Sequence, residues 1–177
     1  MRKWILLLFL LLLAAVLAGC TGKDRQTDEI DGGVRIDEST DAPKTITSTQ
    51  IVSFSCEFST LDLLEESPLG NDVFTLEAVL SDGAVTGSYE TYLTQKQTFE
   101  ADEAFMDLLQ KIVEQYDLAQ YNGTNYRVSG LPDRYGAYLN ILYESDEQIY
   151  ASNNQDCFLP LAAMEELQSL FSETTNQ

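Results

Sequence analysis

The 177-residue chain contains no histidine, so any chemistry must rest on tyrosines, carboxylates and three cysteines. The absence excludes Ser-His-Asp and Cys-His nucleophile systems and histidine general bases, and it removes the commonest zinc ligand. The sequence also lacks a P-loop, the dinucleotide motif G-x-G-x-x-G and the nucleophile elbow G-x-S-x-G. We therefore expect a protein that is not an enzyme, with no catalytic residues, no metal site and no cofactor.

Acidic side chains are abundant, with 29 Asp and Glu against 10 Lys and Arg. Two neighbouring carboxyl groups can hydrolyse glycosides when one is protonated and the other ionised. The acidic clusters lie instead at expected turns and helix faces, where charge is normally solvated. A carboxylate-based hydrolase is therefore the least favoured function. The formal net charge of -19 also argues against a nucleic-acid partner.

Tyrosine is concentrated in one region, because seven of the nine tyrosines lie between Tyr116 and Tyr150. Tyrosine offers a rigid, amphipathic contact area at a low entropy cost, and two arginines share the region. Such a surface suits a peptide or a glycan. The alternative is that these tyrosines cover a sheet face and pack a loop. The candidate binding surface consists of Tyr121, Tyr126, Arg127, Arg134, Tyr135 and Tyr138.

Two cysteines, Cys56 and Cys157, could form one disulfide that ties the first strand of the domain to its last helix. The alternative, which we prefer, is two separate buried thiols that pack as small apolar side chains. A disulfide needs Cα atoms roughly 4.4–6.8 Å apart, and the sequence alone does not bring these two residues together.

The chain opens with two positive residues, Arg2 and Lys3, and an apolar run over residues 4–18. The run is short for a bilayer span, which needs about 20 residues, and matches the apolar region of a signal peptide. Residues 17–20, Leu-Ala-Gly-Cys, resemble the lipobox of bacterial lipoproteins. The resemblance implies a signal peptide over residues 1–19, a lipid on Cys20, and a location on the outer, extracytoplasmic side of a bacterial cell membrane. An uncleaved membrane anchor is the alternative.

The remaining chain predicts a tether and one domain. Residues 20–45 are polar and turn-rich, which is typical of a flexible acidic tether. Residues 46–173 predict a single α+β domain. Alternating apolar residues mark strands at 51–58, 73–80, 84–93, 137–143 and 148–152, and a 3.6-residue period marks helices at 105–116 and 160–171. The order strand, hairpin, helix, hairpin, helix predicts an antiparallel sheet of about five strands with two helices packed on one face. Gly87 within a strand suggests a bulge or a close backbone approach.

Residues 118–158 run from a helix end into Asn122-Gly123, then a strand, an acidic turn and a return strand before the final helix. This pattern is similar to small uncharacterised lipoproteins of Gram-positive anaerobes, and the resemblance implies the same α+β arrangement without any known activity. We therefore expect an envelope-exposed lipoprotein that acts as a non-enzymatic binding or interaction module for an envelope protein, peptide or glycan. Its contact with the membrane is through the lipid on Cys20. An accessory or inhibitory subunit of an envelope protein complex is the alternative function.

Overall fold

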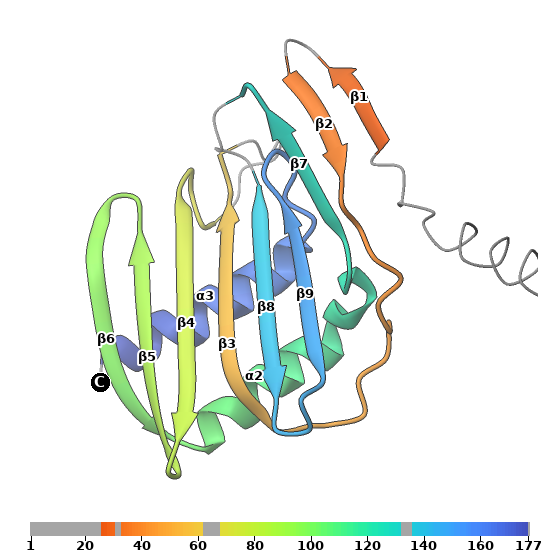
Figure 1. Cartoon of the computed structure of the whole chain (residues 1–177). Coiled ribbons are helices and arrows are strands. Elements are labelled where there is room, and N and C mark those ends of the chain that lie inside the picture. The colour runs from red at the N-terminus through yellow and green to blue at the C-terminus, as the bar shows by residue number, and fades with distance from the viewer. Residues whose placement is uncertain (1–25, 31–32, 62–67, 132–135, 177) are drawn as a thin grey trace, which may run out of the picture.

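The computed structural model describes residues 26–30, 33–61, 68–131 and 136–176 and shows one sheet of nine strands (Figure 1). From one edge to the other the order is β1-β2-β7-β9-β8-β3-β4-β5-β6. The strands are β1 (Gln26–Ile30), β2 (Gly33–Asp37), β3 (Ile51–Ser59), β4 (Val73–Ser81), β5 (Ala84–Thr91), β6 (Thr94–Asp102), β7 (Asn125–Ser129), β8 (Ala137–Tyr143) and β9 (Gln148–Asn153).

β3 lies inside the sheet and pairs antiparallel with both β4 and β8. From β3 the chain continues as a meander through β4, β5 and β6, in which each strand pairs with the one before it. β7 pairs parallel with β9 and antiparallel with β2, so it connects the N-terminal β1–β2 hairpin to the rest of the sheet. The parallel pair makes the sheet mixed.

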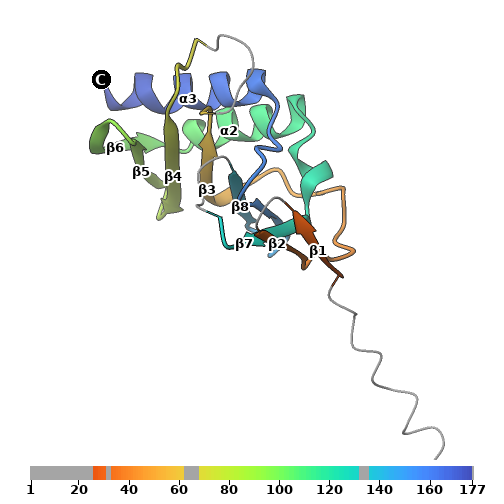
Figure 2. The ribbon, with the colours of Figure 1, turned by 90° about the horizontal axis from the view of Figure 1, so that it is seen from above.

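Two helices cover one face of the sheet and leave the other face uncovered (Figure 2). They are α2 (Ala104–Gln115) and α3 (Leu161–Thr175), and the short 3-10 helix η1 (Leu118–Tyr121) follows α2. Alternate residues of β3, among them Phe54 and Cys56, point toward the helices and are buried. Each helix packs apolar side chains against this face of the sheet. These side chains recur every three or four residues, because residues at that spacing share a helix face.

Phe171 of α3 is the aromatic centre of the core. Its ring lies 5.9 Å from Phe54, 5.7 Å from Phe99 and 5.1 Å from Phe105, measured between ring centroids. It therefore connects β3, β6 and α2 to α3. Aromatic pairs at such distances add about 0.5–1.5 kcal/mol each beyond the area that they bury.

The expected antiparallel sheet of about five strands is wrong, because the sheet has nine strands and includes parallel pairing. The strands that were missed are β1, β2, β6 and β7. β6 reads TQKQTFEAD, and Phe99 is its one buried residue. β7 reads NYRVS and resembles a turn. These strands are fixed by backbone pairing with neighbours rather than by an alternating apolar pattern, which is why the sequence does not reveal them.

Much of the expected tether, residues 20–45, is held on the domain. Residues 26–30 and 33–37 form the β1–β2 hairpin, and the segment 38–48, here called the strap, follows the domain edge. The backbone N–H groups of Glu38 and Thr40 donate to the carbonyls of Asn125 and Gly123, each at 2.8 Å. Lys44 donates to the carbonyl of Asn122. Polar composition predicted a free chain, but these contacts use backbone groups that every residue type has.

Glu147 holds the far end of the strap. Its carboxylate accepts hydrogen bonds from the backbone N–H groups of Thr47 at 3.0 Å and Ser48 at 2.9 Å, and from the Ser145 hydroxyl at 2.9 Å. These donors favour the ionised carboxylate and lower the pKa of Glu147 to about 2. The turn between β8 and β9 is therefore bonded to the strap through a carboxylate.

Candidate binding surface

The uncovered face of the sheet, here called the open face, presents three parallel rows of side chains from β9 to β5, and two of them continue onto β6. The strand register aligns the rows, and their members alternate with the buried residues of the core. Hydroxyl, amide and carboxylate groups predominate. The first row is Ser152, Tyr138, Glu57, Thr75 and Glu90; the second is Tyr150, Asn140, Ser55, Glu77, Ser88 and Thr98; the third is Gln148, Leu142, Ser53, Val79, Thr86 and Glu100.

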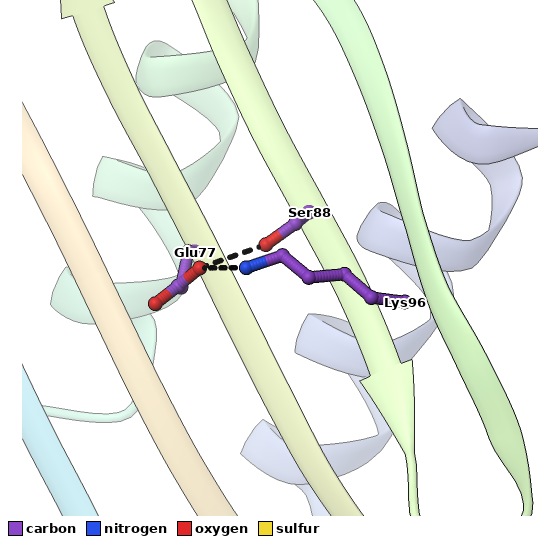
Figure 3. Close-up of polar contacts among 3 residues, drawn as sticks. All are labelled: Glu77, Ser88 and Lys96. Atoms are coloured by element: carbon purple, nitrogen blue, oxygen red, sulfur yellow. Dashed lines mark hydrogen bonds and ion pairs between the residues drawn. The ribbon is translucent and has the colours of Figure 1, made fainter.

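Glu77, Ser88 and Lys96 form a polar cluster on one half of this face (Figure 3). Glu77 Oε2 accepts a hydrogen bond from Lys96 Nζ at 2.7 Å and another from Ser88 Oγ at 2.9 Å. The lysine extends from β6 across β5 to reach β4. Both bonds favour the ionised carboxylate and lower the pKa of Glu77, while the carboxylate raises the pKa of Lys96.

The Glu77–Lys96 pair contributes little to stability, because its side chains are 46% and 50% exposed. Exposed pairs of this kind are worth roughly 0.2–1 kcal/mol. The cluster borders a shallow hollow of about 410 Å³, which includes Ser55, Val79 and Thr86 in its lining. The hollow thus offers an ammonium donor, a carboxylate acceptor and several hydroxyl groups to a polar ligand.

Tyr138 and Tyr150 form an aromatic pair on the other half of the open face. Their ring centroids are 5.8 Å apart and the rings are nearly perpendicular, at 82°. Partial burial, with a smaller contribution from Tyr150, raises the pKa of Tyr138. Beside the rings, Gln148 donates a hydrogen bond to Asn140 at 2.6 Å. This half combines aromatic area with amide groups.

Two of the residues expected to form the binding surface share the open face. Tyr138 pairs with Ser152, and Asn125 of β7 also pairs with Ser152. Arg127 lies two residues beyond Asn125 and is exposed, and because side chains alternate along a strand it lies on the same face. Tyr138 and Arg127 therefore belong to one surface.

The structure places the other described members of the expected surface elsewhere. Tyr126 has the opposite orientation to Arg127, and the Arg35 guanidinium lies 4.3 Å from the centroid of its ring. Tyr121 of η1 packs on Phe158 with 5.1 Å between ring centroids. These two tyrosines pack against the domain itself. The remaining members, Arg134 and Tyr135, lie outside the described residues.

The polar cluster of Glu77, Ser88 and Lys96 was not recognised in the sequence. Its members lie on three different strands, and only the β4–β5 and β5–β6 registers bring them together. The available signal was the outward-facing half of each alternating strand, where serine, threonine and glutamate recur. That signal marks a solvated face without marking a site.

Cys56 and Cys157 are both free thiols in the structure. Cys56 is fully buried in β3, and burial raises the pKa of its thiol. The Cys157 thiol donates to the Met164 sulfur at 3.5 Å, and burial raises its pKa as well. Both thiols are therefore neutral, with Cys56 buried and Cys157 partly buried. Cys20, the expected lipid attachment site, lies outside the described residues.

Within the residues that the structure describes, no three Asp, Glu or Cys side chains gather in a way that could hold a metal ion. No helix in the same ranges is long and apolar enough to cross a membrane, and the apolar run of residues 4–18 lies outside them. Comparison of the chain with protein-family models, with curated proteins and with solved structures gives no match.

Proposed function

We propose that the chain is a non-enzymatic binding module that a lipid on Cys20 holds at a bacterial membrane, with its open face turned to a ligand outside the cytoplasm. The observation that carries this proposal is the open face itself. Among the described residues, no helix covers one face of the nine-stranded sheet, and this face presents hydroxyl, amide, carboxylate and tyrosine side chains in register. A sheet face with this composition remains hydrated until a polar ligand replaces the water.

A glycan is the ligand class that the open face favours. The half around Tyr138 and Tyr150 offers aromatic area for the C–H face of a sugar. The half around Glu77 offers donors and acceptors for sugar hydroxyl groups. An apolar ligand would leave these polar groups without partners, which costs binding free energy.

The electrostatics of the carboxyl groups support binding rather than hydrolysis. A glycosidic general acid needs a raised pKa so that it holds its proton at neutral pH. The surroundings of Glu77 and Glu147 act in the opposite direction and lower the pKa of each. Both groups are therefore ionised at neutral pH and serve as hydrogen-bond acceptors.

An array of neutral oligosaccharides, including oligomers of N-acetylglucosamine, tests the open face. Tyr138→Ala should weaken binding about tenfold, which corresponds to about 1.4 kcal/mol. Tyr92→Ala is the matched control, because Tyr92 is 84% exposed in the β5–β6 turn, away from the rows. If no oligosaccharide binds, or if Tyr138→Ala binds as tightly as wild type, the glycan proposal is wrong. A stoichiometric protein partner would instead favour an accessory or inhibitory subunit.

The anchor is tested separately by metabolic labelling with a clickable fatty acid. The wild-type chain should incorporate the label and fractionate with the membrane. Cys20→Ser should do neither, while Cys157→Ser should behave as wild type because it retains Cys20. Label that persists in Cys20→Ser would contradict the lipid assignment without affecting the open face.

A further inference from the structure

β6 is an edge strand that is paired on one side only. It pairs with β5 on one side and ends the sheet, and no other described residue pairs with its outer edge (Figure 1). Regular pairing with β5 covers residues 97–102. A strand of six residues spans about 20 Å. The outer N–H and C=O groups along this length are available to another extended chain.

A hollow with a mixed polar and apolar lining lies next to this free edge. Its volume is about 450 Å³, and it lies between β6 and the two helices. α3 contacts β6 directly, and its last turns lie beside the strand (Figure 2). The apolar part of the lining is Phe99, Ala101, Ala104, Phe105, Leu108 and Leu170.

Leu108 extends the hollow into a groove between the helices. Leu108 and Leu170 also line a second hollow of about 400 Å³ between α2 and α3. The Leu108 side chain is 44% exposed, although it lies on a helix whose other leucine, Leu109, is fully buried. An exposed leucine beside an unpaired strand edge is a contact that a bound chain could cover.

The charge around the edge selects among partners. Glu100, Asp102, Glu103 and Asp107 are all exposed near the hollow, and the whole chain has a formal charge of -19. Lys96 of the same strand does not offset them, because its ammonium group points away from the edge to Glu77. A second copy of the chain would bring the same negative charge to this edge, whereas a cationic segment would be attracted.

We propose that β6 binds an extended, cationic segment of a partner protein, which adds to the sheet as a further strand. Side chains alternate along such a strand, so one set enters the hollow and the other lies beside Thr98 and Glu100 on the open face. The segment therefore alternates apolar residues with lysine or arginine. Backbone pairing supplies much of the affinity, and the hollow and the acidic residues supply the specificity. This site depends on neither the lipid on Cys20 nor glycan binding.

A fluorescent seven-residue peptide in which lysine and valine alternate tests the site on the full-length chain in a non-ionic detergent. Fluorescence anisotropy should show binding that Leu108→Lys weakens by about tenfold or more, as expected for a central interface contact. Val34→Lys is the matched control, because Val34 is 38% exposed but lies on β2, toward the opposite edge of the sheet from β6. Glu100→Lys should also weaken binding, and Glu144→Lys at the distant β8–β9 turn should not.

Hydrogen exchange then locates the bound peptide. Amides in residues 94–102 should exchange more slowly with the peptide present, while β3 and β8 are unchanged. The same peptide with alternate N-methylated amides should not bind, because it cannot pair with a strand edge. The proposal is overturned if the alternating peptide fails to bind at millimolar concentration or if Leu108→Lys binds it normally. Sedimentation showing that β6 pairs two copies of the chain would overturn it as well.

Discussion

At the scale of single residues, Tyr143 carries a polar group that its surroundings do not satisfy. Its side chain is 1% exposed, and its hydroxyl has no hydrogen-bond partner among the described residues. Burial raises the pKa of the phenol, so the group stays neutral. A buried hydroxyl without a partner loses its hydration and gains no bond in return.

Tyr143→Phe should therefore stabilise the protein, by about 1 kcal/mol, because it removes the unsatisfied hydroxyl and keeps the ring. Tyr89→Phe is the matched control, since the Tyr89 hydroxyl accepts a hydrogen bond from Gln168 at 3.2 Å. That variant should be less stable by about 0.5–1.5 kcal/mol. Urea denaturation measures both, and a loss of stability in Tyr143→Phe would show that its hydroxyl is satisfied.

Gly87 is required because the Phe99 ring lies against it. A Cβ atom at residue 87 would be 2.1 Å from Cζ of Phe99, and the Phe99 ring is fixed by Phe105 and Phe171. Gly87→Ala should therefore destabilise the protein by about 1–3 kcal/mol through overpacking. In a Phe99→Ala background the same substitution should cost little, and thermal unfolding of the four variants measures this coupling. Equal costs in both backgrounds would contradict the contact.

Gly87 also shows what the sequence could reveal about single residues. A glycine inside an alternating strand suggests a bulge or a close backbone approach, whereas the structure shows regular pairing at Gly87 and a side chain, the Phe99 ring, against it. Glu77 and Lys96 gave no comparable signal. They are common surface residue types, and their 2.7 Å contact exists only because two strand registers bring β4 and β6 within reach of a lysine side chain.

At the scale of elements, one carboxylate, that of Glu147, holds the far end of the strap at Thr47 and Ser48. The pKa of Glu147 is about 2 in the folded protein, below its ordinary value of 4.5. Docking of the strap is therefore stabilised above pH 4.5, and this contribution is lost as the pH falls toward 2. The amide chemical shifts of Thr47 and Ser48 should follow this titration with a midpoint near pH 2.

Glu147→Gln should abolish that titration and loosen residues 47 and 48 at neutral pH, because a neutral amide is a weaker acceptor for their N–H groups than a carboxylate. Glu144→Gln at the same turn is the matched control, because Glu144 is exposed and its backbone N–H donates to the Gln50 carbonyl, a bond that the substitution leaves in place. Amide chemical shifts of Thr47 and Ser48 that titrate near pH 4.5 in the wild type would contradict the hydrogen bonds from these residues to Glu147.

The alternating apolar pattern predicts some strands of the sheet and misses others. The alternating segments correspond to β3, β4, β5, β8 and β9, because these strands bury one face in the core. β6 and β7 lie toward the sides of the sheet and bury fewer side chains. β2 adds to β7, and β1 to β2, by backbone pairing, with the Arg35–Tyr126 contact beside it. Backbone pairing does not depend on side-chain type. The polar composition of residues 20–45 therefore predicted a flexible tether.

At the scale of the whole molecule, a lipid on Cys20 would make the β1–β2 hairpin set how far the domain stands from the membrane. A coiled tether of 25 residues would have a root-mean-square reach of roughly 25–30 Å. Because β1 begins at Gln26, the chain from Cys20 to the sheet is six residue steps long and spans at most about 20 Å. If the lipid is on Cys20, the β1 edge must lie within that distance of the bilayer.

Neutron reflectometry of the lipidated protein on a supported bilayer should therefore find the domain no more than about 20 Å from the headgroups. On anionic lipid the gap should approach that limit at low salt, because the net charge, which changes from -19 to -21 when Arg2 and Lys3 are removed with residues 1–19, is repelled by the surface. The gap should shrink as added salt screens the repulsion. Ile36→Pro should widen the gap, since proline removes a ladder bond from β2 and lengthens the free chain. Glu147→Gln should not widen it, because it loosens the strap and leaves β2 paired with β7. A gap well beyond 20 Å in the wild type would show that the hairpin is detached in the anchored protein.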